Sequence, residues 1–251
     1  MQGGKWFLKA AFAALLAFVQ LEAKASDASS DVWLVRRDFI KFGKKEAYES
    51  TKKEFLQGFS QFVKKRDAFS FYAIEVFDSP EYLFLTPLGS FGGIERLMNQ
   101  KKSFQKTFSS QDWEARRLAR ASTINFYFRS VQKFLPQCSC IPAGKERMLA
   151  LPYVQLYWIE ITPGQEYSFE QHLQSMADKQ MKEEAPVCWR VWGEFAGGAL
   201  PQYLIAVFAE SEKDAEARSE KLEFVPGPYK QIVRKQKQSK GMLRTDLTVA
   251  Q

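Results

Sequence analysis

The sequence predicts an α+β protein in which one unit of strands and helices is used twice. Three observations support this: an ungapped internal repeat, apolar runs that alternate with amphipathic segments, and turn residues at matching places in both copies. The repeat appears when the chain is aligned with itself at an offset of 121 residues. Identical residues then meet at Ile40 and Ile161, Gly43 and Gly164, Glu49 and Glu170, Pro80 and Pro201, Tyr82 and Tyr203, Leu83 and Leu204, Ser90 and Ser211, and Glu95 and Glu216, while Tyr48 meets Phe169 and Phe71 meets Trp192.

Each copy opens with an apolar run that ends shortly before a glycine. The runs VWLVRRDFI and VQLYWIEI are predicted strands, and Gly43 and Gly164 allow the backbone to turn from the strand into a helix. Apolar side chains then recur at helical spacing, which predicts an amphipathic helix in each copy. They are Tyr48, Phe55, Phe59 and Phe62 in the first copy, and Phe169, Leu173 and Met176 in the second.

A hairpin and a second helix follow in each copy. The β-rich runs are FSFYAIEVF and EYLFLTPL in the first copy, and CWRVWGEF and QYLIAVF in the second. The loops between them contain Pro80 and Pro201, each expected at the start of a strand, where its missing N–H is tolerated. Ser90 and Ser211 are predicted to cap the second helices, with Asp214 completing a capping box with Ser211.

The resulting plan is a ferredoxin-like β-α-β-β-α-β unit used twice. We place the closing strands near Leu135–Ile141 and Leu243–Val249, and an extra helical stretch at Gln111–Phe134 in the first copy only. The predicted organisation is therefore a first repeat at residues 26–142, a linker at 143–152 and a second repeat at 153–251.

The N-terminal 25 residues have the features of a secretory signal peptide. Lys5 and Lys9 precede the apolar run AAFAALLAFVQL, and the small residues of Ala23-Lys24-Ala25 offer a cleavage site before Ser26. The apolar run of about 12 residues is too short to cross a bilayer as a helix, which takes roughly 20. We therefore expect cleavage after Ala25, no transmembrane segment, and a secreted or periplasmic protein.

The charge balance is basic but moderate. The formal net charge is +7, of which +5 remains once the predicted signal peptide is removed. The basic stretches Lys64–Arg66, Arg116–Arg120 and Tyr229–Lys240 are expected to be solvated faces, with attraction to acidic partners or anionic lipid headgroups as the alternative. Nucleic acid is not an expected partner, because the protein is predicted to be exported and shows no recognition motif.

The chain has three cysteines, Cys138, Cys140 and Cys188. An exported protein permits disulfides, and a bond from Cys188 to one of the other two avoids the very tight ring that Cys138 and Cys140 would close. The alternative is that all three are buried thiols that act as small apolar side chains.

The two units resemble the dimeric α/β-barrel proteins, which include the NIPSNAP-like and antibiotic-biosynthesis-monooxygenase-like proteins. The resemblance covers about residues 31–250 and rests on the glycine before each aromatic-Glu helix and on a late PxYL strand, at Pro80–Leu83 and Pro201–Leu204. It implies that two sheets face each other to form a barrel, and that one chain supplies both. It implies no single activity, because this architecture hosts oxygenases, haem enzymes, isomerases and ligand binders.

His172 is the only histidine and borders the apolar stripe of a predicted helix in the second repeat. It is either a partly buried histidine paired with a backbone group or carboxylate, or a haem axial ligand. The first is the preferred interpretation. The second comes from the resemblance, because the superfamily includes the two-repeat chlorite dismutase-like proteins, whose axial histidine also comes from the second repeat, although the sequence around His172 does not otherwise match theirs. One histidine suffices for haem, since the porphyrin supplies four ligands. Arg190 and Trp192 are the candidates to line that pocket, although strand alternation places Trp189 and Arg190 on opposite faces. A lone histidine without companion ligands predicts no metal site.

Polar residues inside predicted strands are the second group of candidates. Tyr157, Trp158 and Glu160 lie on the first strand of the second repeat, and Arg36, Arg37 and Asp38 on that of the first. Buried charges need partners. We therefore expect either salt bridges between the sheets or the polar end of a ligand pocket that includes Tyr157, Trp158, Glu160 and Arg37.

No catalytic motif identifies a reaction. The sequence lacks a Ser-His-Asp arrangement with credible context, zinc-ligand spacing and a phosphate-binding glycine loop. The preferred interpretation is an exported two-repeat α/β-barrel protein that binds a small, largely apolar molecule between sheet and helices. The alternatives are a haem-dependent or cofactor-free oxygenase or peroxidase of the same superfamily, and a structural interaction protein. Homo-oligomers are compatible with all three.

Overall fold

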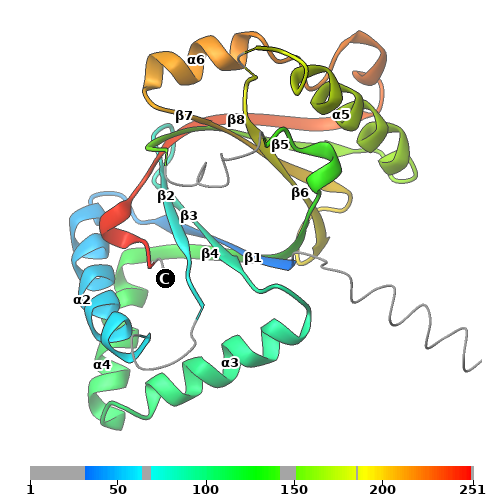
Figure 1. The fold of residues 1–251 in the computed structure, drawn as a ribbon. Helices are drawn as coiled ribbons and strands as arrows, with labels where there is room; N and C mark the ends of the chain where they lie inside the picture. Colours follow the sequence, from blue (N-terminus) through cyan, green and yellow to red (C-terminus); the bar gives the residue numbers. More distant parts are fainter. Residues whose placement is uncertain (1–31, 64–68, 142–150, 185, 250–251) are drawn as a thin grey trace, which may run out of the picture. The chain divides into compact units, whose positions relative to one another are not determined.

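The computed structural model describes residues 32–63, 69–141, 151–184 and 186–249, which belong to one compact unit, Asp31–Gln251. Within these residues eight strands form a closed barrel with helices outside it (Figure 1). The predicted signal peptide and most of the predicted linker lie outside the described residues. The elements are β1 (Val32–Ile40), α2 (Lys45–Val63), β2 (Tyr72–Val76), β3 (Glu81–Pro87), α3 (Gly92–Gln105), α4 (Ser110–Thr123), β4 (Ile124–Phe134), η1 (Pro136–Cys138), β5 (Tyr153–Ile161), α5 (Glu166–Gln180), β6 (Trp189–Ala196), β7 (Gln202–Ala209), α6 (Glu212–Glu220), η3 (Gly227–Tyr229), β8 (Val233–Leu243) and η4 (Thr245–Leu247).

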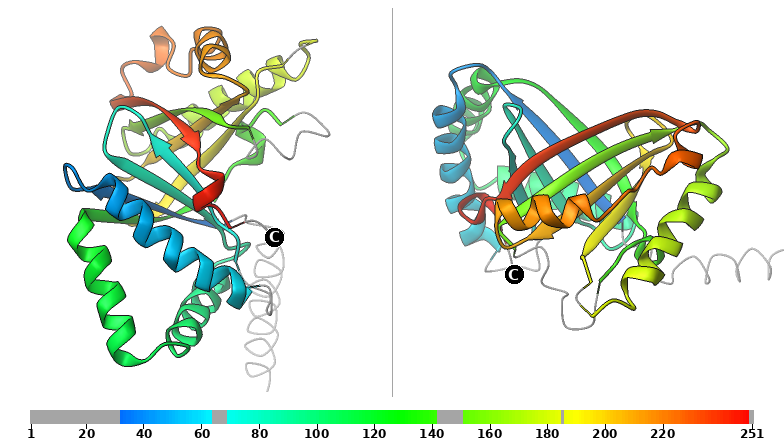
Figure 2. Two further views of the ribbon diagram at one scale, coloured as in Figure 1. Left: turned by 90° about the vertical axis from the view of Figure 1, so that its left-hand side faces the viewer. Right: turned by 90° about the horizontal axis from the view of Figure 1, so that it is seen from above.

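The strand order shows two ferredoxin-like sheets joined edge to edge. Around the barrel it is β1-β3-β2-β8-β5-β7-β6-β4, so each half has the same internal order, β4-β1-β3-β2 and β8-β5-β7-β6. All neighbouring strands are antiparallel, and the two seams are β2 with β8 and β4 with β6. Figure 2 shows the barrel from two further directions. The predicted fold class, two ferredoxin-like repeats forming an α/β-barrel, is confirmed.

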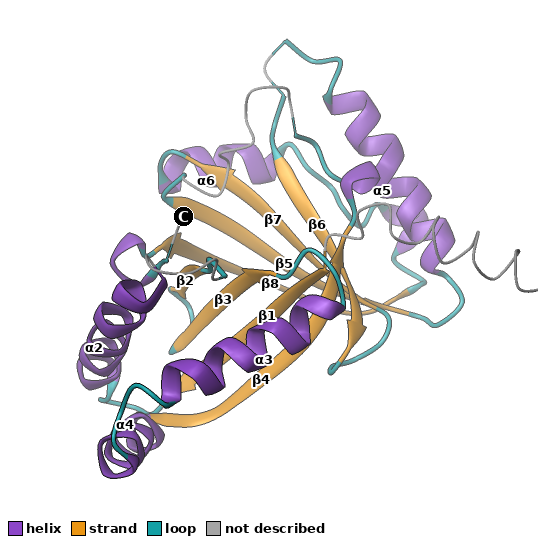
Figure 3. Ribbon diagram, turned by 60° about the horizontal axis from the view of Figure 1, so that its bottom comes forward, coloured by secondary structure: helices purple, strands orange, loops and turns teal. Residues whose placement is uncertain are grey.

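Strand alternation divides most of the apolar side chains into an inner core and two large outer cores. A smaller cluster consists of Val32, Phe69, Leu88 and Leu97. The helices lie on the outer side of the barrel strands (Figure 3). The two outer cores pack side chains of these helices against the sheets. The inner core lies inside the barrel and includes Trp33, Val35, Leu83, Leu85, Leu156, Trp158, Trp192, Leu204 and Phe208. The first outer core includes Tyr48, Leu56, Phe59, Tyr82 and Phe84. The second outer core includes Phe169, Leu173, Trp189, Val191, Tyr203 and Phe224.

The internal repeat corresponds to contacts that occur once in each half. Gly43 and Gly164 have φ angles of 70° and 87°, which confirms the predicted turns between strand and helix. The late-strand tyrosine donates a hydrogen bond to the helix glutamate in both halves, from Tyr82 to Glu49 and from Tyr203 to Glu170. The repeated glutamate and tyrosine therefore tie the first helix of each half to its sheet.

The predicted closing strands are wrong in position. The strands that close the two halves are β4 and β8. They end at Phe134 and Leu243, where the predicted closing strands begin. The extra helix α4 ends at Thr123, so the predicted helical stretch Gln111–Phe134 contains a helix followed by a strand. β8 was missed because its sequence, VRKQKQSKGML, is too polar to show an apolar strand pattern.

The segments taken for closing strands are tails that cross to the opposite half. The first tail, residues 135–141, places Cys138 and Cys140 in the second outer core and pairs Cys140 with Trp189. The second tail, residues 244–249, places Leu247 and Val249 in the first outer core and pairs Val249 with Phe71. Each outer core is therefore completed by the other half of the chain.

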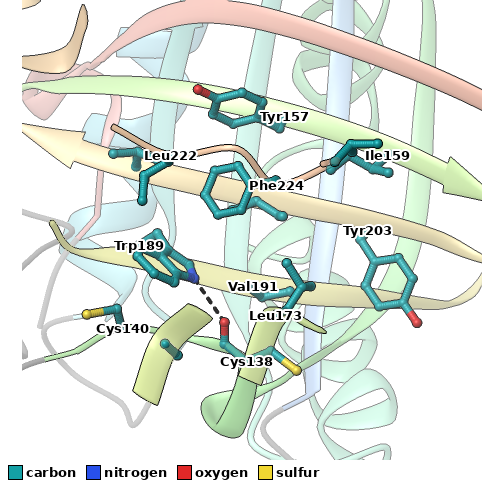
Figure 4. Close-up of a cluster of buried hydrophobic side chains, with 14 of the residues drawn as sticks. Cys138, Cys140, Tyr157, Ile159, Leu173, Trp189, Val191, Tyr203, Leu222 and Phe224 are labelled. Atoms are coloured by element: carbon teal, nitrogen blue, oxygen red, sulfur yellow. Dashed lines mark hydrogen bonds between the residues drawn. The ribbon is translucent and has the colours of Figure 1, made fainter. Parts of the chain in front are cut away.

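All three cysteines are buried, as the second of the two interpretations expected. Cys188 faces the inner core, whereas Cys138 and Cys140 belong to the second outer core (Figure 4). The sheet lies between the two groups, which explains why the proposed bond to Cys188 is not formed. The Trp189 indole donates to the Cys138 carbonyl at 2.9 Å.

Three smaller predictions need correction. Ser211 caps α6 through its side chain, but Asp214 accepts from the backbone of Glu210 rather than from Ser211. Ser90 does not cap α3, which begins after Phe91 without a side-chain cap.

Phe71 and Trp192 are not equivalent, because the second hairpin is longer: Glu75 pairs with Tyr82, whereas Gly193 pairs with Tyr203. Both strands begin one residue after the predicted Pro80 and Pro201.

Candidate functional site

Two of the predicted residues of β1 and β5, Arg37 and Trp158, meet inside the barrel. Arg37 donates two hydrogen bonds to Glu81, at 2.5 and 3.0 Å, and its guanidinium lies 4.8 Å from the centre of the Trp158 ring. Lys237 of the second half approaches Glu81 to 3.8 Å and Trp158 to 5.5 Å. This group links the two sheets across the barrel, as the salt-bridge interpretation predicted.

The other two predicted pocket residues of β5 do not join this group. The Tyr157 ring faces the second outer core, packs against Phe224 at 5.0 Å and accepts a hydrogen bond from Gln238. Glu160 lies 3.4 Å from Arg234 near the end of β5. Tyr157 is separated from Arg37 and Trp158 because odd and even residues of β5 point to opposite faces.

The three residues predicted for a haem pocket lie on two sides of the second sheet. Trp192 faces the inner core, 5.6 Å from the Trp33 ring, and the Arg190 guanidinium lies over the Phe134 ring at 5.4 Å. His172 is on α5, outside the barrel, and stacks on Tyr229 at 4.3 Å. The second outer core, which packs between β6 and α5, therefore separates His172 from Arg190 and Trp192.

The space next to His172 is filled by the second outer core. Phe169, Leu173 and Trp189 are fully buried between α5 and the sheet (Figure 4). Burial lowers the pKa of His172, while hydrogen bonds with the backbone of Phe224 and Glu223 oppose this shift. A macrocycle bound by His172 would have to displace several of these side chains, so the residues present do not fit a haem in this conformation.

A cleft of about 630 Å³ lies between α2, α4 and the start of β4. Four arginines line it, three from α4 and one from β4, together with aromatic side chains. The lining residues are Phe55, Trp113, Arg116, Arg117, Arg120, Ala121, Ile124, Asn125, Phe126, Tyr127 and Arg129. We refer to it as the arginine cleft.

Helix geometry explains why α4 contributes so much of this lining. Trp113, Arg116, Arg117 and Arg120 are spaced at i, i+3, i+4 and i+7, which places them on one helical face. From the sequence, these basic residues were predicted to be a solvated stretch without a connection to Trp113. The helical spacing of an aromatic residue and three arginines was the available signal.

The positive charge of the cleft is only partly compensated. Arg117 donates two hydrogen bonds to Glu114, and Arg120 lies 3.6 Å from Asp38. Arg116 and Arg129 contact the rings of Phe108 and Tyr127, at 5.0 and 4.9 Å, and have no carboxylate partner among the described residues. The Nε atom of Arg120 is buried and also has no hydrogen-bond partner there.

Among the described residues, Asp38 is the carboxylate at the centre of a cationic group next to the cleft, because Arg36, Lys52 and the cleft residue Arg120 all approach it. Arg36 donates two hydrogen bonds to it at 2.6 Å, Tyr48 donates one at 2.8 Å, and Lys52 lies 3.7 Å away. Burial lowers the pKa of Lys52 to about 7, with Arg36 adding to the shift and Asp38 opposing it. The neighbourhood therefore disfavours further positive charge and favours an anion.

Other kinds of site find less support in the described part of the chain. No group of three or more histidine, cysteine or acidic side chains there could hold a metal ion. Burial raises the pKa of Cys138 to about 12, so its thiol stays protonated and is a poor nucleophile. None of the described helices has the length and apolar character needed to span a membrane.

Comparison with known proteins gives fold neighbours but no sequence relatives. No family model matches the sequence, and no curated protein matches it. Similar solved structures include a candidate monooxygenase from Lactobacillus acidophilus, with 9% identity over 88% of this chain and 98% of that chain and a TM-score of 0.51. An anthrone oxidase-like protein has 11% identity over 87% and 93% of the two chains, with a TM-score of 0.53. A chlorite dismutase variant from Candidatus Nitrospira defluvii has 12% identity over 88% and 93%, with a TM-score of 0.52.

The chain has the dimeric α/β-barrel fold. The predicted resemblance is thus confirmed at the level of the fold, over most of the length of these neighbours. Identities near 10% carry no activity from the other dimeric α/β-barrel structures to this one.

Proposed function

We propose that this protein binds a small, flat organic anion in the arginine cleft. The observation that carries the proposal is a cleft of about 630 Å³ whose walls combine aromatic rings with four arginines. Its volume lies in the range typical of small-molecule sites. The cleft also lies between helices and sheet, where sequence analysis expected a ligand with a largely apolar body.

The arginines indicate that the ligand also carries a negative group. Arg116 and Arg129 line the cleft and have no carboxylate partner among the residues that the structure describes. Guanidinium groups suit carboxylates and sulfonates because they present several N–H donors in one plane. Trp113, Phe126 and Tyr127 offer faces against which a flat ring can stack. A neutral apolar molecule would leave these charges unmatched.

The proposal is tested by titration with naphthalene-2-sulfonate, followed by calorimetry and by the indole resonance of Trp113. We expect one-to-one binding that weakens with added salt, and much weaker binding of the uncharged naphthalene-2-methanol. Arg116→Gln and Arg129→Gln should each reduce the affinity roughly tenfold, because each removes a charge-assisted hydrogen bond.

Arg218→Gln is the matched control, because this arginine lies on α6 and is paired with Asp214 at 2.7 Å. It should leave the affinity unchanged. Equal binding of the charged and uncharged probes, or an equal loss in all three arginine variants, would contradict binding in the cleft.

The fold neighbours keep an oxidative enzyme as an alternative. Their names include a monooxygenase, an anthrone oxidase-like protein and a chlorite dismutase. A haem-dependent form is checked by titrating the protein and His172→Ala with haem. Because the second outer core fills the space beside His172, we expect no Soret band that depends on this residue. Saturable one-to-one binding that is lost in His172→Ala would make it an axial ligand.

We also propose that the chain is exported, on the basis of the charge, apolar run and cleavage site in residues 1–25. Expression in a bacterial host followed by fractionation should give a periplasmic or secreted protein. Mass spectrometry should then find Ser26 as its first residue. A cytoplasmic protein that retains residues 1–25 would argue against export.

A further inference from the structure

Four polar atoms inside the barrel have no hydrogen-bond partner among the described residues. They are the indole Nε1 atoms of Trp33 and Trp192, the Oε1 atom of Gln132 and the Oε1 atom of Glu194. Trp33, Gln132 and Trp192 are at most 4% exposed. Buried polar groups are nearly always satisfied in folded proteins, so a set of four calls for a partner.

Strand pairing brings these four side chains onto one inner surface. Gln132 of β4 is paired with Trp33 of β1 on one side and with Glu194 of β6 on the other. Trp192 precedes Glu194 by two residues and therefore points to the same face of β6. The rings of Trp33 and Trp192 are 5.6 Å apart in an edge-to-face arrangement. The four atoms thus belong to three adjacent strands.

The hydrogen-bonding capacity of this set defines the chemistry that it can accept. The two indoles offer one N–H donor each, and Gln132 and Glu194 offer one acceptor oxygen each. The Gln132 amide nitrogen already donates one hydrogen bond, to Ser130 at 3.2 Å, so it is not among the four unpartnered atoms. A ligand that satisfies these four atoms therefore needs two acceptor lone pairs and two N–H or O–H donors.

The site favours an uncharged ligand. Burial raises the pKa of Glu194 to about 7, and the charge of Arg37 opposes this shift. A considerable share of the carboxyl groups is therefore neutral near pH 7. A buried anion or cation would lack a full counter-charge here, and burial of an unpaired charge is costly.

We propose that the barrel interior has a second binding site, at Trp33, Gln132, Trp192 and Glu194, for a small uncharged molecule with a primary amide or urea group. The amide oxygen has two lone pairs for the indoles, and the NH₂ group has two hydrogens for Gln132 and Glu194. Because β1 and β6 are separated by β4, the backbones that carry these side chains are two inter-strand spacings apart, about 4.8 Å each. An amide group spans more of this distance than one water molecule does.

The loop between β6 and β7 lies directly over the carboxyl group. A Cβ atom built on Gly198 would fall 2.0 Å from the Glu194 Oε1 atom. Any side chain at this position therefore has to push the carboxyl group aside. Gly198→Ala thus alters the site without changing its charge or its hydrogen-bonding groups.

Acetamide is the probe for this site, and acetone is its control, because acetone has a similar size but no donor. Both are titrated into protein labelled with ¹⁵N, and the indole N–H resonances are assigned with Trp33→Phe and Trp192→Phe. We expect acetamide to shift the resonances of Trp33 and Trp192 saturably, and acetone to leave them unchanged. The absence of a saturable shift, or equal shifts with both compounds, would overturn the proposal.

Two variants and a control localise the effect. Gln132→Leu removes one acceptor and should weaken acetamide binding about tenfold. Gln236→Leu changes an exposed glutamine on β8 and should leave the affinity unchanged. If Gln132→Leu does not fold, Gly198→Ala carries the test and should also weaken binding. A crystal structure with acetamide that shows only water at the four atoms would overturn the proposal as well.

Discussion

Burial moves two ionisable side chains toward neutral pH from opposite directions. The pKa of Glu194 rises to about 7 and that of Lys52 falls to about 7, in both cases mainly because the charged form loses contact with water. Nearby charges decide how far each shift goes: Arg37 opposes the shift of Glu194, and Arg36 adds to that of Lys52. Small changes in pH therefore alter the charge inside the barrel and beneath the arginine cleft.

Glu194→Gln should remove one component of the pH dependence of stability. Burial raises the pKa of Glu194 from its ordinary value of 4.5 to about 7 in the folded protein, so the folded state binds an additional proton between these two pH values. The contribution of this group is therefore fully present below pH 4.5 and is lost as the pH rises through 7. It is on the order of 2 kcal/mol after allowance for partial exposure. Urea unfolding of both proteins across this window measures it, and identical slopes would show that the carboxyl group is hydrated.

Gly43→Val and Gly164→Val should both destabilise the protein. Nothing lies within 4 Å of a Cβ atom built at either position, so the cost comes from the positive φ angles alone. A left-handed residue with a side chain costs roughly 1–2 kcal/mol, and a β-branched side chain costs more. Gly227→Val is the control, because Gly227 also has open space but no positive φ. Equal melting temperatures for the three variants would refute this account of the turns.

A site residue could be predicted from sequence only where the pattern of its own strand marks it as unusual. Arg37 and Trp158 were identified as charged and aromatic positions in half-buried strands, and they meet at 4.8 Å. Their partners Glu81 and Lys237 could not be named, because the contact depends on which strands face each other across the barrel. Gln132 and Glu194 were not predicted as site residues for the same reason, because each is an ordinary polar residue of a strand until its neighbours are known.

At the scale of elements, predictability follows the apolar pattern. β1, β3, β5 and β7 are apolar or aromatic along much of their length and were located correctly. β4 and β8 were misplaced because they carry polar residues over long stretches: residues Asn125–Arg129 of β4 are exposed, and β8 is rich in Lys and Gln. The aromatic and β-branched residues of INFYFRSV nevertheless have strong strand propensity, a signal that was outweighed by the preceding helical pattern.

Arg244 should be the most costly surface arginine to remove. It follows β8 and donates hydrogen bonds to Glu49 of α2 at 2.6 and 2.8 Å and to Glu75 of β2 at 2.6 Å. These contacts hold the pKa of Glu49 at about 2. Arg244→Leu leaves two largely buried carboxylates without their partner, which should lower the free energy of unfolding by roughly 2–4 kcal/mol.

Arg117→Leu is the control for this prediction. Arg117 also donates two hydrogen bonds to one carboxylate, that of Glu114, but both side chains are exposed. Its removal should leave stability nearly unchanged, because exposed ion pairs contribute little. Urea unfolding of the two variants compares them. Equal losses would mean that the Arg244 contacts do not join the second tail to the first half.

At the scale of the whole molecule, the two halves depend on each other. Two strand seams join them, and each tail completes the outer core of the opposite half. The internal repeat predicted two similar units, but similarity between the halves does not reveal an exchange of segments. The exchange follows from three-dimensional packing, and in sequence it appeared only as two apolar segments after the true closing strands.

Neither half should therefore fold by itself. Fragments 26–142 and 143–251, expressed separately, should lack a cooperative unfolding transition, because each has two open strand edges and an incomplete outer core. Co-expressed fragments should associate and recover the transition. Circular dichroism with thermal unfolding, on the separate and the combined fragments, makes the comparison. A cooperative transition in either isolated fragment would show that the halves are independent domains.

The second tail also sets a time scale during synthesis. Tyr48 and Phe59 of α2 leave the ribosome long before Leu247 and Val249, which pack against the same outer core. At elongation rates of ~5–20 residues per second, that apolar surface waits on the order of ten to forty seconds for its last partners. During this interval the nascent chain presents an aromatic face that chaperones bind and that other nascent chains can reach. The position of a few residues near the C-terminus thus governs how long the first half is exposed to aggregation.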